Sequence, residues 1–278
     1  MRIKYLKLII CLIIISLFIS CDRHFNPPTG ENTPVEIDTT KKKVMLLEFT
    51  GVSCINCPEA SKKMHDLIDN YGGSVVGIAF HPLGDVNAKP FSDSTIIWNE
   101  LGRVLHAAGG GPGLPGGLVD IMPHSGNKIL TFTNWESKII EASGQDADLK
   151  LNISSSYDET TFEVSVDIDI EYVNEAGEND YLAIYLVEDH YIAKQKDKKE
   201  TLENYEHNNI ARAAFDDEYW GISIYNDITD MKYQKTFTYT VPQDNYWNEE
   251  NLRIVAIVYD YEGTYSVKQI EEDFLFDD

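Results

Sequence analysis

Cysteine, basic residues and long apolar runs are scarce in this chain, and each scarcity excludes a class of protein. Four cysteines among 278 residues cannot form the dense disulfide framework of a small secreted domain. Lysine and arginine number 23 against 46 aspartate and glutamate residues, which excludes the basic surface that nucleic-acid binding requires. The one long apolar run, Leu8 to Ser20, is too short to span a bilayer as a helix.

The N-terminus has the pattern of an export signal. Arg2, Lys4 and Lys7 precede the apolar run, as in secretory signals, and Cys21 follows a small residue at its end, which resembles the lipobox of bacterial lipoproteins. Cleavage before Cys21 would leave this cysteine carrying the lipid, whereas the alternative is a plain buried cysteine. The sequence therefore predicts a signal peptide over residues 1–20 and a membrane anchor at Cys21.

The mature chain divides by composition into a tether and two domains. Residues 21–41 have little apolar content and predict a flexible lipidated tether. Residues 42–145 carry 8 basic and 10 acidic side chains, whereas residues 146–278 carry 10 basic and 32 acidic ones. The acidic excess favours a solvated surface over a site for cations or basic ligands.

Residues 42–145 predict an α/β domain with a thioredoxin-like core. Two apolar strands flank an amphipathic helix, so we expect them to run parallel through a helical crossover. A second helix, a glycine and proline loop, a hairpin and a last helix follow. The predicted elements are strand Lys43–Thr50, helix Pro58–Tyr71, strand Ser74–Phe80, helix Ser94–Ala108, strands Leu118–Met122 and Lys128–Phe132, and helix Asn134–Ala142.

Residues 146–278 change to an alternating pattern that predicts an all-β immunoglobulin-like sandwich. Phe162 to Ile170 is the clearest case, since its apolar residues alternate with acids. Residues 190–228 lack the pattern and predict a long irregular insertion. The predicted strands are 149–155, 162–172, 181–188, 235–241 and 252–259.

Cys54-Ile-Asn-Cys57 lies between the first strand and the first helix, which is typical of a thioredoxin-type redox motif. The start of a helix stabilises a thiolate, so we expect an exposed Cys54 to attack disulfides and an inward Cys57 to resolve the mixed disulfide. A permanently oxidised structural pair is one alternative. A zinc site is the other, but it would need two further ligands that no spacing supplies, so we predict no metal and no cofactor.

Two further positions fit this chemistry. Glu48 lies six residues before Cys54, where thioredoxin-like proteins hold a buried acid that moves protons for the resolving cysteine. The alternative is a glutamate that reaches solvent from an edge strand. Pro115 resembles the thioredoxin cis-proline, which faces the cysteine pair and would make Leu114 the residue that pairs with an extended substrate.

A second polar and aromatic cluster runs from Tyr205 to Ala214 and continues at Tyr219 to Gly221. No nucleophile elbow accompanies it. We interpret it as packing between the insertion and its surroundings rather than as a ligand site.

Taken together, Glu48 to Pro58, the loop Gly113 to Gly117, and Tyr205 to Asn209 with Arg212-Ala213 resemble an outer-membrane lipoprotein family, of about 28 kilodaltons, that joins a thioredoxin-like domain to a β-sandwich. The resemblance implies an outer-membrane location more firmly than a reaction. Ser53 stands where ordinary thioredoxins have tryptophan, which argues against a general reductase.

We therefore expect a lipid-anchored envelope protein that exchanges disulfides with exported clients or a redox partner. One alternative is a surface binding or adhesion lipoprotein in which the cysteine pair is a structural disulfide, and another is a structural spacer with no chemistry.

Overall fold

The computed structural model describes residues 40–91, 97–243 and 247–276, which belong to one unit, Pro34–Asp278. The predicted signal peptide, the lipidation site Cys21 and almost all of the tether lie outside the described residues. Among the helices of the described ranges, none is both long and apolar enough to cross a membrane.

The first part of the unit is a parallel strand pair connected by a helix. β1 (Val44–Phe49) and β2 (Val75–Phe80) are wholly buried and pair in parallel, and α2 (Cys57–Tyr71) connects them. Pro58 is tolerated in the first turn of α2, and Gly72 ends the helix in a left-handed conformation at φ 46°. These elements lie within one residue of the predicted bounds.

Three further elements complete this part. β3 (Gly116–Val119) pairs antiparallel with β1. α3 (Glu100–Ala108) begins at Glu100 because the Asn99 side chain accepts a hydrogen bond from the Gly102 amide at 2.8 Å. The predicted second hairpin strand is reduced to an isolated bridge at Leu130, since the chain then enters the 3₁₀ helix η2 (Phe132–Asn134) and α4 (Trp135–Ala142).

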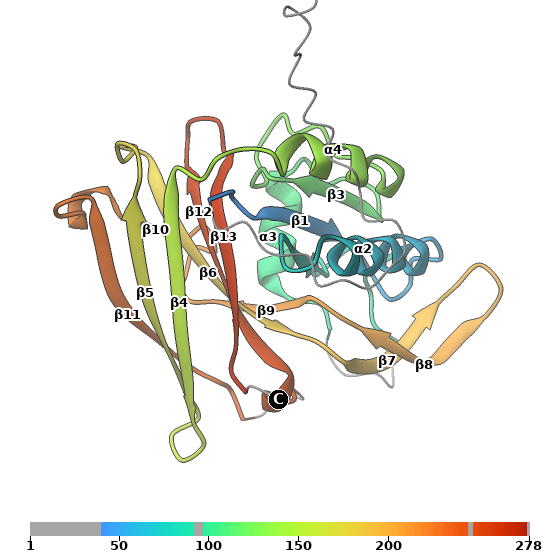
Figure 1. The fold of residues 1–278 in the computed structure, drawn as a ribbon. Helices are drawn as coiled ribbons and strands as arrows, with labels where there is room; N and C mark the ends of the chain where they lie inside the picture. The colour runs from blue at the N-terminus through green and yellow to red at the C-terminus, as the bar shows by residue number, and fades with distance from the viewer. Residues whose placement is uncertain (1–39, 92–96, 244–246, 277–278) are drawn as a thin grey trace, which may run out of the picture. The chain divides into compact units, whose positions relative to one another are not determined.

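A single sheet of eight strands joins the two halves of the sequence (Figure 1). Its order is β13-β12-β6-β9-β2-β1-β3, with β10 paired to β6. The predicted boundary near residue 145 therefore does not separate two sheets. The strands from the second half are β6 (Asp180–Glu188), β9 (Ile210–Ala214), β10 (Ile222–Ser223), β12 (Leu252–Asp260) and β13 (Val267–Phe274).

A second, three-stranded sheet packs on part of this long sheet. It consists of β4 (Leu149–Asp158), β5 (Glu163–Tyr172) and β11 (Lys232–Thr240), in the order β11-β5-β4. The alternating apolar residues of β5 are buried in one cluster with residues of β6 and β12, as the sequence pattern predicts. The opposite faces of β6 and β12 pack instead against β1, β2 and α3.

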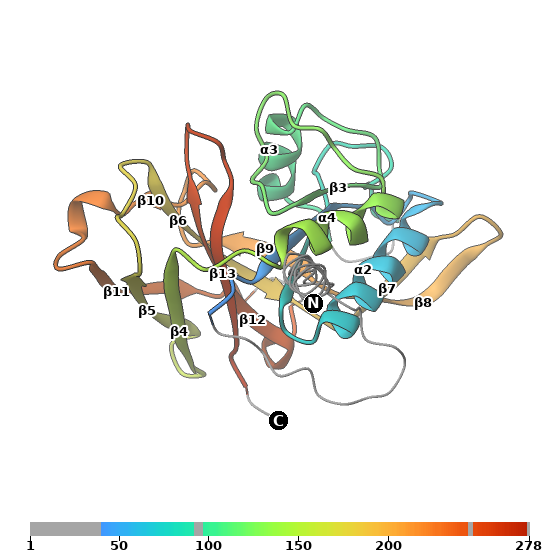
Figure 2. The same cartoon turned by 45° about the horizontal axis from the view of Figure 1, so that its top comes forward.

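The expectation of an irregular insertion over residues 190–228 is wrong. This segment contains β9, which pairs with both β6 and β2, and a separate hairpin of β7 (Tyr191–Lys196) and β8 (Thr201–His207). The hairpin lies beside α2 in both ribbon views (Figures 1 and 2). Short 3₁₀ helices complete the described elements: η3 (Tyr225–Asp227) and η4 (Glu249–Asn251).

Candidate functional site

Cys54 and Cys57 form a disulfide where β1 gives way to α2, with their Cα atoms 5.4 Å apart. The Cys54 amide donates to Gly51 O at 3.1 Å and the Cys57 amide donates to Cys54 O at 3.3 Å. These tight turns place Cys57 as the first residue of α2 and Cys54 just before it. Both sulfur atoms therefore lie at the positive end of the helix dipole, as the motif predicts.

The expectation that Cys54 is exposed is wrong. Cys54 is only 5% exposed and Cys57 1% exposed. The prediction failed because β7, more than 130 positions further along the chain, packs against the loop that carries the pair.

The β7–β8 hairpin lies against the loop that carries the cysteines. The Gln195 side-chain amide donates to Gly51 O at 3.2 Å and to Cys54 O at 3.1 Å. The Lys196 backbone amide donates to Val52 O at 2.8 Å. An apolar cluster seals the same contact, and its buried members are Val52, Ile97, Tyr191, Ala193 and Ile210.

Glu48 is fully buried in β1, which lies between β2 and β3, so the alternative of a solvent-exposed edge glutamate is wrong. The Ser61 hydroxyl lies 3.2 Å from both carboxylate oxygens and comes from α2, one turn after Cys57. Burial raises the pKa of Glu48 from 4.5 to about 8, although hydrogen bonds from Ser61 and Thr50 oppose the shift. The carboxyl group is therefore protonated at neutral pH and can donate a proton near α2.

A cavity of about 350 Å³ opens beside Glu48. Tyr205 and His207 from β8 line it together with Ser61, Glu48 and His81. The cluster from Tyr205 onward, which the sequence analysis interpreted as packing, therefore lines this cavity. Nothing in its sequence signalled that β8 would reach the first strand pair.

The two histidines of this cavity are neutral. Their ring centroids lie 6.0 Å apart, and burial lowers the pKa of His207 to about 4 and that of His81 well below 6.5. Burial also raises the pKa of Tyr205 to about 12. Glu48, His81, Tyr205 and His207 are thus uncharged at neutral pH, whereas two further residues of the lining, Lys62 and Glu206, are charged.

Pro115 lies near the end of β1 that leads into the cysteine loop. The Leu114–Pro115 peptide bond is cis. Gly116 pairs with Phe49 in the antiparallel register of β3 and β1, which places Pro115 opposite Thr50, four residues before Cys54. The Leu114 side chain packs partly buried against the first core cluster, so a client could pair only with its backbone.

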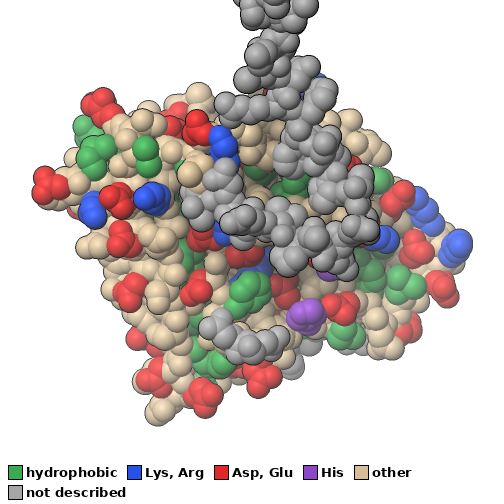
Figure 3. Space-filling view, in the orientation of Figure 1, with side chains coloured by type: hydrophobic (Ala, Val, Ile, Leu, Met, Phe, Trp, Pro, Cys, Tyr) green, Lys and Arg blue, Asp and Glu red, His purple; other side chains and the backbone are tan. Residues whose placement is uncertain are grey.

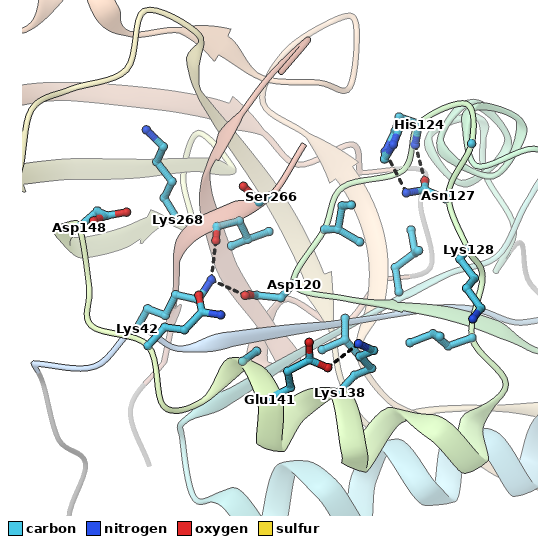
Figure 4. Close-up of a pocket in the computed structure, with 18 of the residues that line it drawn as sticks. Lys42, Asp120, His124, Asn127, Lys128, Lys138, Glu141, Asp148, Ser266 and Lys268 are labelled. Atoms are coloured by element: carbon cyan, nitrogen blue, oxygen red, sulfur yellow. Dashed lines mark hydrogen bonds and ion pairs between the residues drawn. The ribbon is translucent and has the colours of Figure 1, made fainter. Parts of the chain in front are cut away.

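A larger cavity of about 590 Å³ lies elsewhere and holds neither cysteine nor Glu48 (Figure 4). Four of its charged groups form two ion pairs: Lys42 pairs with Asp120 and donates to Val267 O at 2.7 Å, and Lys138 pairs with Glu141. Within the described ranges, no group of three or more histidine, cysteine, aspartate or glutamate residues could hold a metal ion.

The model of the outer membrane protein Omp28 family matches residues 108–275, which is more than half of the sequence. The chain belongs to the Omp28 family. This membership confirms the predicted outer-membrane location. The match includes Pro115 and β7 to β9 but begins after the cysteine pair, so Cys54 and Cys57 lie outside it.

Comparison with solved structures extends the similarity of fold to most of the chain. HBP35 of Porphyromonas gingivalis superposes with a TM-score of 0.68 at 16% identity, over 84% of this chain and 76% of that one. Protein AGR_C_4864 from Agrobacterium tumefaciens gives a TM-score of 0.51 at 12% identity, over 85% and 96%. A domain of the outer membrane lipoprotein Omp28 from P. gingivalis gives 0.33 at 18% identity, over 46% and 88%. No curated protein matches the sequence.

Proposed function

We propose that this Omp28-family protein exchanges disulfides with exported client proteins through Cys54 and Cys57, while a lipid on Cys21 anchors it to the membrane. One observation carries the proposal. The disulfide lies at the start of α2, and one turn further along the helix Ser61 contacts a buried carboxyl group with a pKa of about 8. A redox disulfide and a proton donor are the two components that this chemistry requires.

The exchange begins with the Cys54–Cys57 disulfide intact. A client thiolate attacks Cys54 Sγ, a client–Cys54 disulfide forms, and Cys57 leaves as a thiolate. Glu48 donates its proton to Cys57 and recovers one from solvent. A second client thiolate then attacks the client sulfur of the mixed disulfide and releases Cys54, so the client dithiol is oxidised as the pair Cys54–Cys57 is reduced. The same steps in reverse reduce a client disulfide.

Pro115 and Leu114 have a positioning role in this proposal. The register that places Pro115 opposite Thr50 supports it. An extended client segment would pair with the Leu114 backbone and bring its sulfur to Cys54.

We also propose a thioredoxin-like arrangement for residues 42–145, supported by the β1-α2-β2 crossover with β3 and α4. For residues 146–278 we propose an immunoglobulin-like sandwich, supported by the packing of β4, β5 and β11 on β6 and β12.

The reduction potential of the Cys54–Cys57 pair tests the proposal. Working oxidoreductases have potentials of about −120 to −270 mV, whereas structural disulfides lie below about −300 mV. We expect a value in the first range, measured by equilibration with glutathione and thiol alkylation. A value below about −300 mV contradicts the proposal.

Trapping of clients gives an independent test. Cys57→Ser removes the resolving thiol, so a mixed disulfide on Cys54 should persist and carry exported proteins in a non-reducing gel. Cys54→Ser is the matched control and should trap none. Recovery of small thiols alone from Cys57→Ser would count against exchange with protein clients.

The second candidate function is a surface binding or adhesion protein in which the disulfide is structural. The burial of both cysteines and the contact of β7 with their loop favour it. The same potential measurement separates the two candidates, since a structural bond resists reduction.

A further inference from the structure

Unlike the other described strands of the second half, β7 and β8 belong to neither of the two larger sheets. They pair only with each other, as a separate two-stranded sheet. β9, which follows at once, is instead fixed between β6 and β2. Movement of the hairpin would therefore break no hydrogen bond of either larger sheet.

Each end of the hairpin has a residue in the left-handed backbone region. His190, immediately before β7, has φ 55°, and Asn209, shortly after β8, has φ 62°. The base is anchored, because the Asn209 amide donates to Asp189 Oδ1 at 2.6 Å and Arg253 binds the other oxygen of Asp189 at 2.8 Å. A fixed base and a separate two-stranded arm are features of a segment that can swing.

Polar contacts hold the arm against the disulfide loop and α2. They include the Gln195 bonds to Gly51 O and Cys54 O, the Lys196 amide bond to Val52 O, the Tyr205 hydrogen bond with Ser61, and the ion pair of Lys198 with Glu59 on α2 at 2.6 Å. Side chains of both charges gather at the outer end of the arm, at the right of Figure 3. The loop carbonyls at 51, 52 and 54 thus accept hydrogen bonds from an extended strand.

We propose that the β7–β8 hairpin is a displaceable cover over the Cys54–Cys57 disulfide, and that an extended client segment must take its place for exchange to occur. The inference rests on the proposed function and adds its regulation. Closed, the hairpin leaves Cys54 almost inaccessible. Open, it withdraws its hydrogen bonds from the carbonyls of residues 51, 52 and 54, and the amides of an extended client can replace them.

The test is the rate at which an uncharged phosphine reduces the disulfide in the full chain. Gln195→Leu keeps the side-chain volume but removes both donors to the disulfide loop. We expect reduction about tenfold faster than in the wild type, since each lost hydrogen bond contributes a factor of roughly 2 to 10. The uncharged reductant excludes direct electrostatic effects on its approach.

A surface variant avoids any disturbance of the core. Lys198→Glu places a like charge opposite Glu59 and should accelerate reduction about two- to fivefold. Adding Glu59→Lys in the same chain restores an ion pair with its charges exchanged and should return the rate toward the wild-type value. Lys199→Glu is the matched control, because its exposed side chain makes no ion pair with the described residues. It should leave the rate unchanged.

Hydrogen exchange identifies the moving part. In Gln195→Leu the Lys196 amide, which donates to Val52 O, should exchange faster, whereas the amides of β9 should keep wild-type protection. The proposal is overturned if Gln195→Leu and Lys198→Glu both reduce within twofold of the wild type, or if β9 loses protection together with β7. A reduction potential typical of a structural disulfide, with the variants still accelerated, would leave the cover in place and remove only the exchange function.

Discussion

Glu48 and Glu188 are both fully buried acids of the same eight-stranded sheet, but their surroundings differ. Glu188 in β6 binds Arg212 Nε at 2.6 Å and accepts the Asn248 amide at 2.9 Å. Glu48 in β1 contacts the Ser61 hydroxyl and has no ion pair within the described residues. A buried charge persists when a cation compensates for it, whereas an isolated carboxyl group takes up a proton.

The difference separates an acid that pairs with a cation from one that holds a proton. Arg212 and Glu188 lie where β9 joins β6, and the Arg212 guanidinium also stacks 4.5 Å from the Tyr191 ring. This pair therefore links β9 to β6 within the second half of the sequence. Glu48 carries its proton beside a cavity and near the disulfide, which is the arrangement expected of a group that exchanges protons.

The largest expected effect comes from breaking the ion pair of Arg212 with Glu188. Arg212→Met keeps much of the side-chain stem but leaves Glu188 buried without its cation. We expect the free energy of unfolding to fall by about 3 to 5 kcal/mol, because an uncompensated buried charge is strongly destabilising. Denaturant unfolding measures the change. Lys62→Met, which breaks the exposed pair with Asp66 at 2.7 Å, is the control and should stay within about 0.5 kcal/mol of the wild type.

The buried proton of Glu48 should also make the free energy of unfolding depend on pH. Glu48 is protonated in the folded state up to about pH 8 but ionises near 4.5 when unfolded. The folded state therefore binds the extra proton between these values, and stability falls as pH rises through this window. The loss should reach about 3 kcal/mol between pH 5 and 7.5, since each pKa unit corresponds to about 1.36 kcal/mol. Glu48→Gln, which is permanently neutral, should lack this loss.

Denaturant unfolding of the wild type and of Glu48→Gln at several pH values between 5 and 7.5 measures how the free energy of unfolding changes with pH in each protein. Groups other than Glu48 contribute equally to both curves, so the subtraction isolates its contribution. Parallel curves for the two proteins would mean that Glu48 is ionised when folded, and the proton-donor role would then be lost.

The sequence predicted the local elements of this site but not its cover. β1, α2 and β2 followed from apolar periodicity, a proline and a glycine, all of which act within a few residues. The cover did not, because β7 buries the polar Gln195 beside Tyr191 and Ala193 while it exposes Ile192, so its alternation is not hydrophobic. β9 likewise buries Arg212 among alanines. Its place in the sheet depends on partners far away in sequence, including Arg253, which bonds Asn209 and Gly77 O.

The burial of Glu48 also depends on residues far away in sequence and could not be predicted from its neighbours. Its position before the motif allowed both a buried acid and an edge residue, because sequence does not say which strand lies outermost. β3 on one side and β2 on the other decide the matter. The family match adds nothing here, since it begins at residue 108.

The smallest expected effect concerns the other wall of the cavity. Burial lowers the pKa of His207 from 6.5 to about 4, so the unfolded chain binds a proton that the folded one does not. Stability therefore falls as pH drops from 6.5 toward 4, which is the opposite direction from Glu48. We expect the loss attributable to His207 between pH 6 and 5 to be about 1 kcal/mol, and to disappear in His207→Gln. An unchanged acid slope in that variant would show that His207 is already charged in the folded protein, and the cavity beside Glu48 would then hold a cation that raises the acidity of its carboxyl group.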